Sequence, residues 1–136
     1  MNNNIDRKEL FRLACEARKA SYSPYSKTSV GAALCTESGN IYTGANIENS
    51  AYPMTVCAEQ VAIFKAVNAG ERKFIAIAVA GGRAGEGEKS IFPPCGACRQ
   101  IMREFSSGEL EVILSADGEA KTLSELLPLS FGGEHL

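Results

Sequence analysis

The chain has 136 residues, 45% of them hydrophobic and 22% charged, which predicts one soluble globular domain over residues 1–136. A formal net charge of −2, with basic residues scattered among acidic ones, argues against nucleic acid as a partner. No apolar run approaches the ~20 residues that cross a bilayer, and the polar start of the chain lacks the apolar segment of a secretion signal. We therefore expect a cytoplasmic protein that does not bind membranes.

The first quarter of the chain predicts a helix followed by a hairpin. Asp6 and Glu9 are spaced as a capping box for a helix that runs to about residue 20, where a Ser-Pro-Tyr-Ser segment ends it. Two extended segments follow, over residues 29–36 and 41–46. The Glu-Ser-Gly-Asn connector between them is typical of a hairpin turn.

Strands and helices alternate after residue 56. We expect a helix over 57–68, a strand over 74–80, a glycine-rich loop over 81–90, a short helix from about 95, a strand over 110–114 and a closing helix over 123–127. The first of these helices is apolar nearly all round and is expected to be buried on most sides, with Gly70 as a left-handed C-cap. The order predicts an α/β fold, a three-layer α/β/α sandwich with a mixed central sheet.

Three of the five cysteines form a motif that suits a metal. Cys57 is followed two residues later by Glu59, and Pro94 precedes a Cys-x-x-Cys segment of Cys95 and Cys98. An odd cysteine count does not suit a complete disulfide framework, and clustered thiols in a reducing compartment are more often metal-binding or catalytic. Three protein ligands leave the fourth position of a tetrahedral Zn²⁺ to water, which is typical of a catalytic site.

Glu59 is spaced as a proton carrier beside such a metal. If it is buried, its carboxyl has a raised pKa suited to proton transfer near neutral pH. The plainer alternative is an acidic residue that favours the helix dipole. If Cys57 and Cys95 both begin helices, the metal lies between two helix N-termini, whose partial positive charge favours thiolates.

Other interpretations of the cysteines fit less well. A Cys-x-x-Cys segment also serves structural zinc ribbons and redox pairs. A structural site would need a fourth ligand, and the candidates are poor: Cys15 and Cys35 lie in regular segments as small buried hydrophobes, and His135 is expected to be a solvated tail residue. A redox pair would not require Cys57 and Glu59.

A set of short segments, in order along almost the whole chain, resembles the cytidine deaminases in their small homotetrameric form. The segments are Ser23-Pro24-Tyr25-Ser26, Val30-Gly31-Ala32-Ala33-Leu34, Asn46-Ile47-Glu48-Asn49, Cys57-Ala58-Glu59, Pro94-Cys95-Gly96-Ala97-Cys98-Arg99-Gln100 and Leu126-Leu127-Pro128. Three cysteines with a non-ligand glutamate and a Pro-Cys-x-x-Cys segment are the signature of zinc deaminases.

The resemblance implies an enzyme of pyrimidine salvage. It would hydrolyse cytidine and deoxycytidine to uridine and deoxyuridine with release of ammonia, with one Zn²⁺ per subunit held by Cys57, Cys95 and Cys98. In this mechanism zinc-bound hydroxide attacks C4 of the ring, and Glu59 moves the protons.

The resemblance also implies where the nucleoside binds. Asn46 and Glu48 would hold the sugar and Ala58 would line the pocket, while neighbouring subunits would complete it through Ala51, Tyr52 and Phe131. From the residues alone, strand-end turn roles for Asn46 and Asn49 are an equal alternative.

The chain departs from the family pattern at two positions. Where members commonly have an aromatic residue near the pyrimidine, this chain has Thr28. Where many have an arginine after the catalytic glutamate, it has Gln60, which forms hydrogen bonds without adding positive charge. We therefore expect a less electrophilic zinc than in an arginine-bearing relative.

Three rival functions compete with this interpretation of the sequence. The loop over residues 82–90 nearly matches a phosphate-binding loop, but one inserted residue and two glutamates argue against it. A non-catalytic zinc interaction module would need a closed metal site. Within enzymes, Thr28 leaves open the deamination of another aminated pyrimidine nucleoside, such as an antibiotic of the blasticidin type.

Overall fold

A five-stranded mixed sheet forms the centre of the computed structural model, which describes residues 5–89 and 91–136. Its spatial order is β2-β1-β3-β4-β5, and only the β3–β4 pair is parallel. The strands are β1 (Thr28–Thr36), β2 (Ile41–Ala45), β3 (Phe74–Arg83), β4 (Glu111–Ile113) and β5 (Ala120–Thr122).

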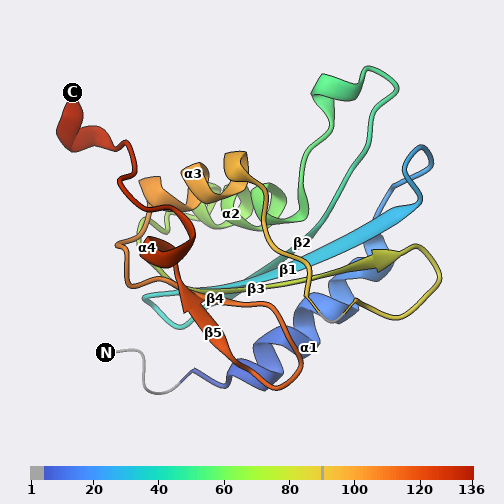
Figure 1. Cartoon of the computed structure of the whole chain (residues 1–136), viewed down its shortest axis with the longest axis horizontal. Coiled ribbons are helices and arrows are strands. Elements are labelled where there is room, and N and C mark those ends of the chain that lie inside the picture. Colours follow the sequence, from blue (N-terminus) through green and yellow to red (C-terminus); the bar gives the residue numbers. More distant parts are fainter. Residues whose placement is uncertain (1–4, 90) are drawn as a thin grey trace.

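Helices cover both faces of this sheet, so the predicted three-layer α/β/α sandwich is confirmed (Figure 1). The helices are α1 (Arg7–Ala17), α2 (Ala58–Asn68), α3 (Gly96–Glu104) and α4 (Leu123–Leu126), with short 3₁₀ turns at Arg18–Ala20, Tyr52–Met54 and Gly133–His135. The helix α1 packs on one face, while α2 and α3 lie side by side on the other. None of the helices in the described part of the chain is long and apolar enough to cross a membrane.

Strand alternation divides the core into two layers. In β1, Val30, Ala32 and Leu34 face α2 and α3, whereas Ala33 and Cys35 face α1. The side chains on both faces are buried because helices cover each side, which explains the continuous apolar runs in β1 and β3.

The close approach of α2 to the sheet depends on a glycine. A Cβ on Gly44 of β2 would lie 2.6 Å from the backbone nitrogen of Ala62 and 2.7 Å from the carbonyl oxygen of Ala58. A larger residue would therefore push α2 away from β2. This contact fixes the first turns of α2, where Cys57 and Glu59 lie.

At the start of α1, only one of the two hydrogen bonds of the predicted capping box forms. Asp6 caps the helix, since its side-chain oxygen accepts a hydrogen bond from the backbone N–H of Glu9 at 3.0 Å. The reciprocal half of the capping box was wrong, because the Glu9 carboxylate instead binds the Arg12 guanidinium at 2.8 Å. The ion pair between Glu9 and Arg12 therefore takes the place of the expected hydrogen bond between the Glu9 side chain and the backbone N–H of Asp6.

Two further expectations were wrong. The helix α2 has the predicted length and ends near Gly70, whose φ is +97°, but it is buried on one side only, and Phe64 is 47% exposed. The sheet covers one face of the helix, which an apolar sequence cannot reveal. Gly81 and Gly82 belong to β3 rather than to a loop, because they pair with Val30 and Ser29 of β1.

Candidate active site

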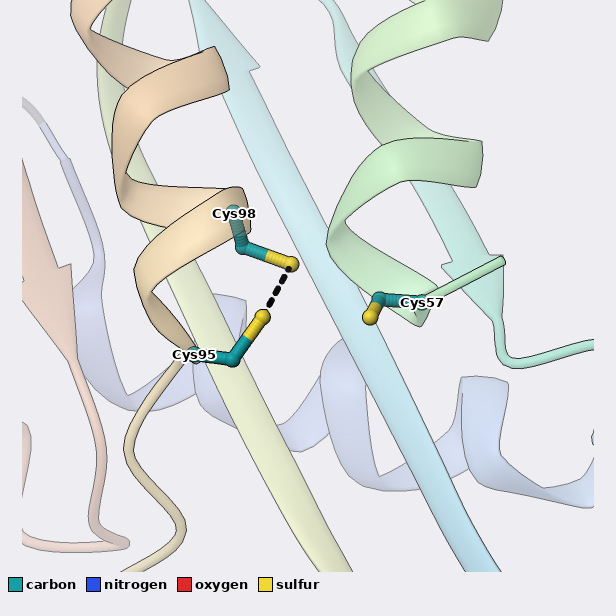
Figure 2. A group of neighbouring side chains, drawn as sticks. All are labelled: Cys57, Cys95 and Cys98. Carbon is teal, nitrogen blue, oxygen red and sulfur yellow. Dashed lines mark hydrogen bonds between the residues drawn. The ribbon is translucent and has the colours of Figure 1, made fainter. Parts of the chain in front are cut away.

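Three sulfurs converge where two helices begin (Figure 2). Cys57 is the N-cap of α2, Cys95 is the N-cap of α3, and Cys98 lies in the first turn of α3. Their Sγ atoms all lie within 4.8 Å of one another, and those of Cys95 and Cys98 are 3.5 Å apart. Tetrahedral zinc with Zn–S bonds of about 2.3 Å holds its sulfurs about 3.8 Å apart, so the cluster fits this ion.

The surroundings of the cluster favour thiolates. Both helices point their N-terminal backbone N–H groups and positive dipole ends toward the sulfurs. A hydrogen bond from Cys98 lowers the pKa of Cys57 to about 7 against the opposing effect of burial, and the same bond raises the pKa of Cys98. Three sulfurs held this close together select a soft metal ion such as Zn²⁺.

The cluster is open on one side. Cys98 is buried, Cys57 is half-buried and Cys95 is exposed. In the described part of the chain, no other His, Cys, Asp or Glu joins the group as a fourth ligand. A metal held here would keep a position accessible to water, which distinguishes a catalytic centre from a closed structural one. His135 lies on the exposed C-terminal tail, as predicted.

Gln60 bridges the two helices at the cluster. Its side-chain Nε2 lies 3.9 Å from the Sγ atom of Cys98, to which it donates, and its Oε1 accepts from the backbone N–H of Cys57 at 3.4 Å. The residue thus forms the hydrogen bonds expected from the sequence. It brings no positive charge to a centre that already contains three thiols and a carboxyl group.

Arg99 is a positioning residue that the sequence did not assign. Its Nε donates to the Pro94 carbonyl oxygen and its Nη1 to the Leu126 carbonyl oxygen, both at 2.8 Å. These bonds tie the start of α3, and with it Cys95, to the C-terminal segment. The only sequence signal was an arginine directly after Cys98, since the bond to Leu126 joins residues 27 positions apart and both partners are backbone atoms.

Glu59 is a buried carboxyl group in the first turn of α2, with 4% of its surface exposed. Burial raises its pKa, and a contact with the Cys98 thiol partly opposes that rise. A buried carboxyl group that contacts the Cys98 thiol and has a raised pKa is suited to accept and return protons. The structure therefore satisfies the condition set for the proton-carrier role.

Asn46 directly follows β2, and its buried side chain is largely engaged within the chain. Its Oδ1 accepts from the Ser21 hydroxyl at 2.6 Å and from the Val30 N–H at 2.9 Å, while its Nδ2 donates to the Thr28 carbonyl oxygen at 2.9 Å. It holds the start of β1 in place, and sugar binding by this residue stays a prediction.

Glu48 organises the loop before β1. Its carboxylate accepts from the backbone N–H groups of Tyr25 at 2.9 Å and Ser26 at 3.1 Å and from the Ser26 hydroxyl, and these bonds lower its pKa. A hollow of about 340 Å³ lies beside it, lined partly by Tyr25, Ser26 and Tyr52. Asn49 has the alternative turn role, since its Oδ1 accepts a hydrogen bond from the Ala51 N–H at 2.8 Å.

The residues expected to come from neighbouring subunits are surface residues in the single chain. Tyr52 is 70% exposed beside Tyr25, and Phe131 is 56% exposed and stacks on His135. Ala51 is also exposed, whereas Ala58 is buried at the start of α2. The segments with Tyr52 and Phe131 project from opposite ends of the α2–α3 layer (Figure 1).

The sequence matches the family model described as "Cytidine and deoxycytidylate deaminase zinc-binding region" over residues 4–114. It is 47% identical to a cytidine deaminase of Sporosarcina psychrophila over 135 residues, which cover 97% of this chain and 96% of that protein. Among solved structures, the cytidine deaminase of Burkholderia pseudomallei superposes with a TM-score of 0.83 at 40% identity, covering 93% of this chain and 100% of the other. That of Mycobacterium tuberculosis has a TM-score of 0.84 at 32% identity, with 95% and 99% covered.

The geometry predicts that zinc content depends on Cys98 and not on Cys15. Cys98→Ser removes one of three sulfurs, so the purified variant should retain little zinc after dialysis against a chelator. Cys15→Ser is the matched control, since Cys15 lies in α1 outside the cluster. Elemental analysis of both proteins would measure this, and equal zinc contents would contradict the assignment.

Because Gln60 is a neutral side chain bonded to Cys57 and Cys98, a positive charge at this position should change zinc binding and turnover. Gln60→Arg should strengthen zinc binding and raise turnover about tenfold, because a full charge a few ångströms away contributes on the order of 1 kcal/mol or more. Gln60→Leu, which removes the hydrogen bonds without adding charge, is the control and should weaken zinc binding. Unchanged zinc affinity and rate in Gln60→Arg would refute the prediction.

Proposed function

The chain belongs to the cytidine and deoxycytidylate deaminase family, and we propose that it converts cytidine and deoxycytidine to uridine and deoxyuridine by hydrolysis, releasing ammonia. The observation that carries the proposal is the open cluster of three sulfurs beside a buried carboxyl group at two helix N-termini. The 136 residues would act as one catalytic domain.

Zinc bound by Cys57, Cys95 and Cys98 would supply a water-derived nucleophile at neutral pH. The Glu59 side chain, as its carboxylate, would take a proton from the attacking water and pass it to N3 of the cytosine ring. As the water oxygen forms its bond to C4, the ring loses its aromatic character. Glu59 then carries the second water proton to the exocyclic nitrogen, so that the C4–N bond breaks and ammonia leaves.

We assign the sugar to Asn46 and Glu48. In Asn46, Nδ2 donates one hydrogen bond, to the Thr28 carbonyl oxygen, and its second N–H would donate to a ribose hydroxyl. The Glu48 carboxylate is ionised at neutral pH, since hydrogen bonds lower its pKa, and it would accept from a hydroxyl but repel a phosphate. These charges favour a nucleoside over a nucleotide. The buried Ala58, next to the first metal ligand, would line the base.

The working form is proposed to be a homotetramer in which Ala51, Tyr52 and Phe131 complete the pockets of neighbouring subunits. Exposed apolar side chains of this kind mark interfaces between chains. Tyr52, Phe131 and Phe64 are all about half or more exposed in the single chain. All five cysteines are free thiols, which suits a role in pyrimidine salvage in the reducing cytoplasm.

Ultraviolet absorbance of the zinc-loaded protein with four separate substrates would test the proposed activity. Cytidine and deoxycytidine should lose the cytosine absorbance, whereas CMP and adenosine should not change. No change with any of them, together with a metal that exchanges no ligand, would favour a non-catalytic zinc module. Turnover of only another aminated pyrimidine nucleoside would favour the antibiotic-type alternative.

The proton-carrier role predicts the behaviour of Glu59→Gln. An amide of the same shape cannot accept and return protons, so the rate should fall about 10²- to 10⁴-fold, with zinc content and melting temperature close to those of the wild type. Glu109→Gln is the control, since the Glu109 side chain is exposed and forms no hydrogen bond in the described structure. A fully active Glu59→Gln protein would rule out the role.

Shared pockets predict complementation between two defective proteins. Phe131→Ala and Glu59→Gln subunits should each have low activity, but hybrids formed by co-expression contain pockets with an intact Glu59 from one chain and an intact Phe131 from the other. Mixed assemblies should therefore be more active than either parent. Activity equal to the average of the parents, or a monomeric wild type in sedimentation, would contradict the proposal.

A further inference from the structure

The sheet surface beneath the metal cluster offers no aromatic side chain of its own. In β1 the side that faces α2 and α3 carries Thr28 and Val30, and the register pairs these two residues with Arg83 and Gly81 of β3. None of these four residues is aromatic, so these strand positions offer a flat heterocyclic substrate no ring to pack against. An aromatic contact on this side must come from another segment.

Phe92 covers this surface. A Cβ on Gly81 would lie 2.5 to 2.7 Å from three ring carbons of Phe92, so the ring occupies the space that a side chain at position 81 would fill. The ring is partly buried and packs against the core layer that contains Val30, Cys57 and Cys98. Phe92 also lies three residues before Cys95 in the segment that leads into α3.

The other aromatic residues of this layer lie at the opposite end of the sheet. Phe74 begins β3 and packs on Phe105 at a centroid distance of 5.4 Å, and Tyr42 donates to Glu71 beyond the end of α2. Since α2 and α3 both end near the start of β3, their N-termini with the cysteines lie toward its far end. In the described chain, Phe92 is thus the aromatic member of this layer at the cysteine end.

We propose that Phe92 is the ring against which the cytosine base packs, and thus a substrate-positioning residue for the base. This inference rests on the proposed function. Stacking on an aromatic side chain depends on a flat π-face and not on hydrogen-bonding groups. Phe92 therefore selects for a planar ring and holds it in plane beside the metal, while Glu59 acts on its N3. A contact present in both the bound substrate and the transition state changes KM more than kcat.

The test compares Phe92→Leu with Phe92→Tyr in the zinc-loaded protein, with uridine as a non-reacting probe of base binding. Phe92→Leu should weaken uridine binding and raise the KM for cytidine about tenfold, while kcat and zinc content stay near wild type. Phe92→Tyr keeps the ring and should bind uridine nearly as well as the wild type. If Phe92→Leu does not fold, Phe92→Met provides the same comparison.

Phe105→Leu is the matched control, because it makes the same change in the same core layer at the far end of the sheet. It should lower the melting temperature without changing uridine affinity. Unchanged uridine affinity in Phe92→Leu, or an equal loss in Phe105→Leu, would overturn the inference. Neither result would contradict the proposed function. That function fails only if the wild-type protein deaminates no pyrimidine nucleoside.

Discussion

Three sulfurs from two helices must meet within the coordination radius of one ion, and this requirement governs how α2 and α3 lie on the sheet. Gly44 lets α2 approach β2 closely, and Arg99 ties the start of α3 to two carbonyl oxygens. The parallel β3–β4 pair allows α3 to cross the same face of the sheet as α2. The metal cluster is therefore a property of the whole fold rather than of the short motifs that contain the cysteines.

The same arrangement sets the electrostatics of the site. Three thiols and the buried Glu59 carboxyl group lie together at the cluster. The Gln60 side chain that donates to Cys98 there is a neutral amide and not a cation. The two helix N-termini supply the compensating partial charge. Within this site burial raises the pKa of Glu59, while a hydrogen bond from Cys98 lowers the pKa of Cys57 to about 7.

Much of the fold and site could be predicted from sequence because local signals and packing agree there. Apolar periodicity located the helices and main strands, and residue types at fixed spacing identified the cysteines and Glu59. The sequence could not show which face of α2 stays uncovered, as at Phe64, since that depends on contacts distant in the chain. The strand β5 is three residues long and only partly buried, so it left no pattern. Asn46 and Glu48 were predicted to hold the sugar, which stays a prediction, and their hydrogen bonds to the start of β1 and the preceding loop required coordinates.

The short helix α3 also connects the cysteine cluster to the C-terminal segment of the chain. Arg99 binds the Leu126 carbonyl oxygen, and the next residue, Gln100, donates to the carbonyl oxygen of Phe131. The first turns of α3 thus carry the sulfurs of Cys95 and Cys98 and also hold the segment from which the C-terminal arm leaves the domain. Any distortion of these turns, by metal loss or oxidation of their thiols, would be transmitted through these two hydrogen bonds to the arm.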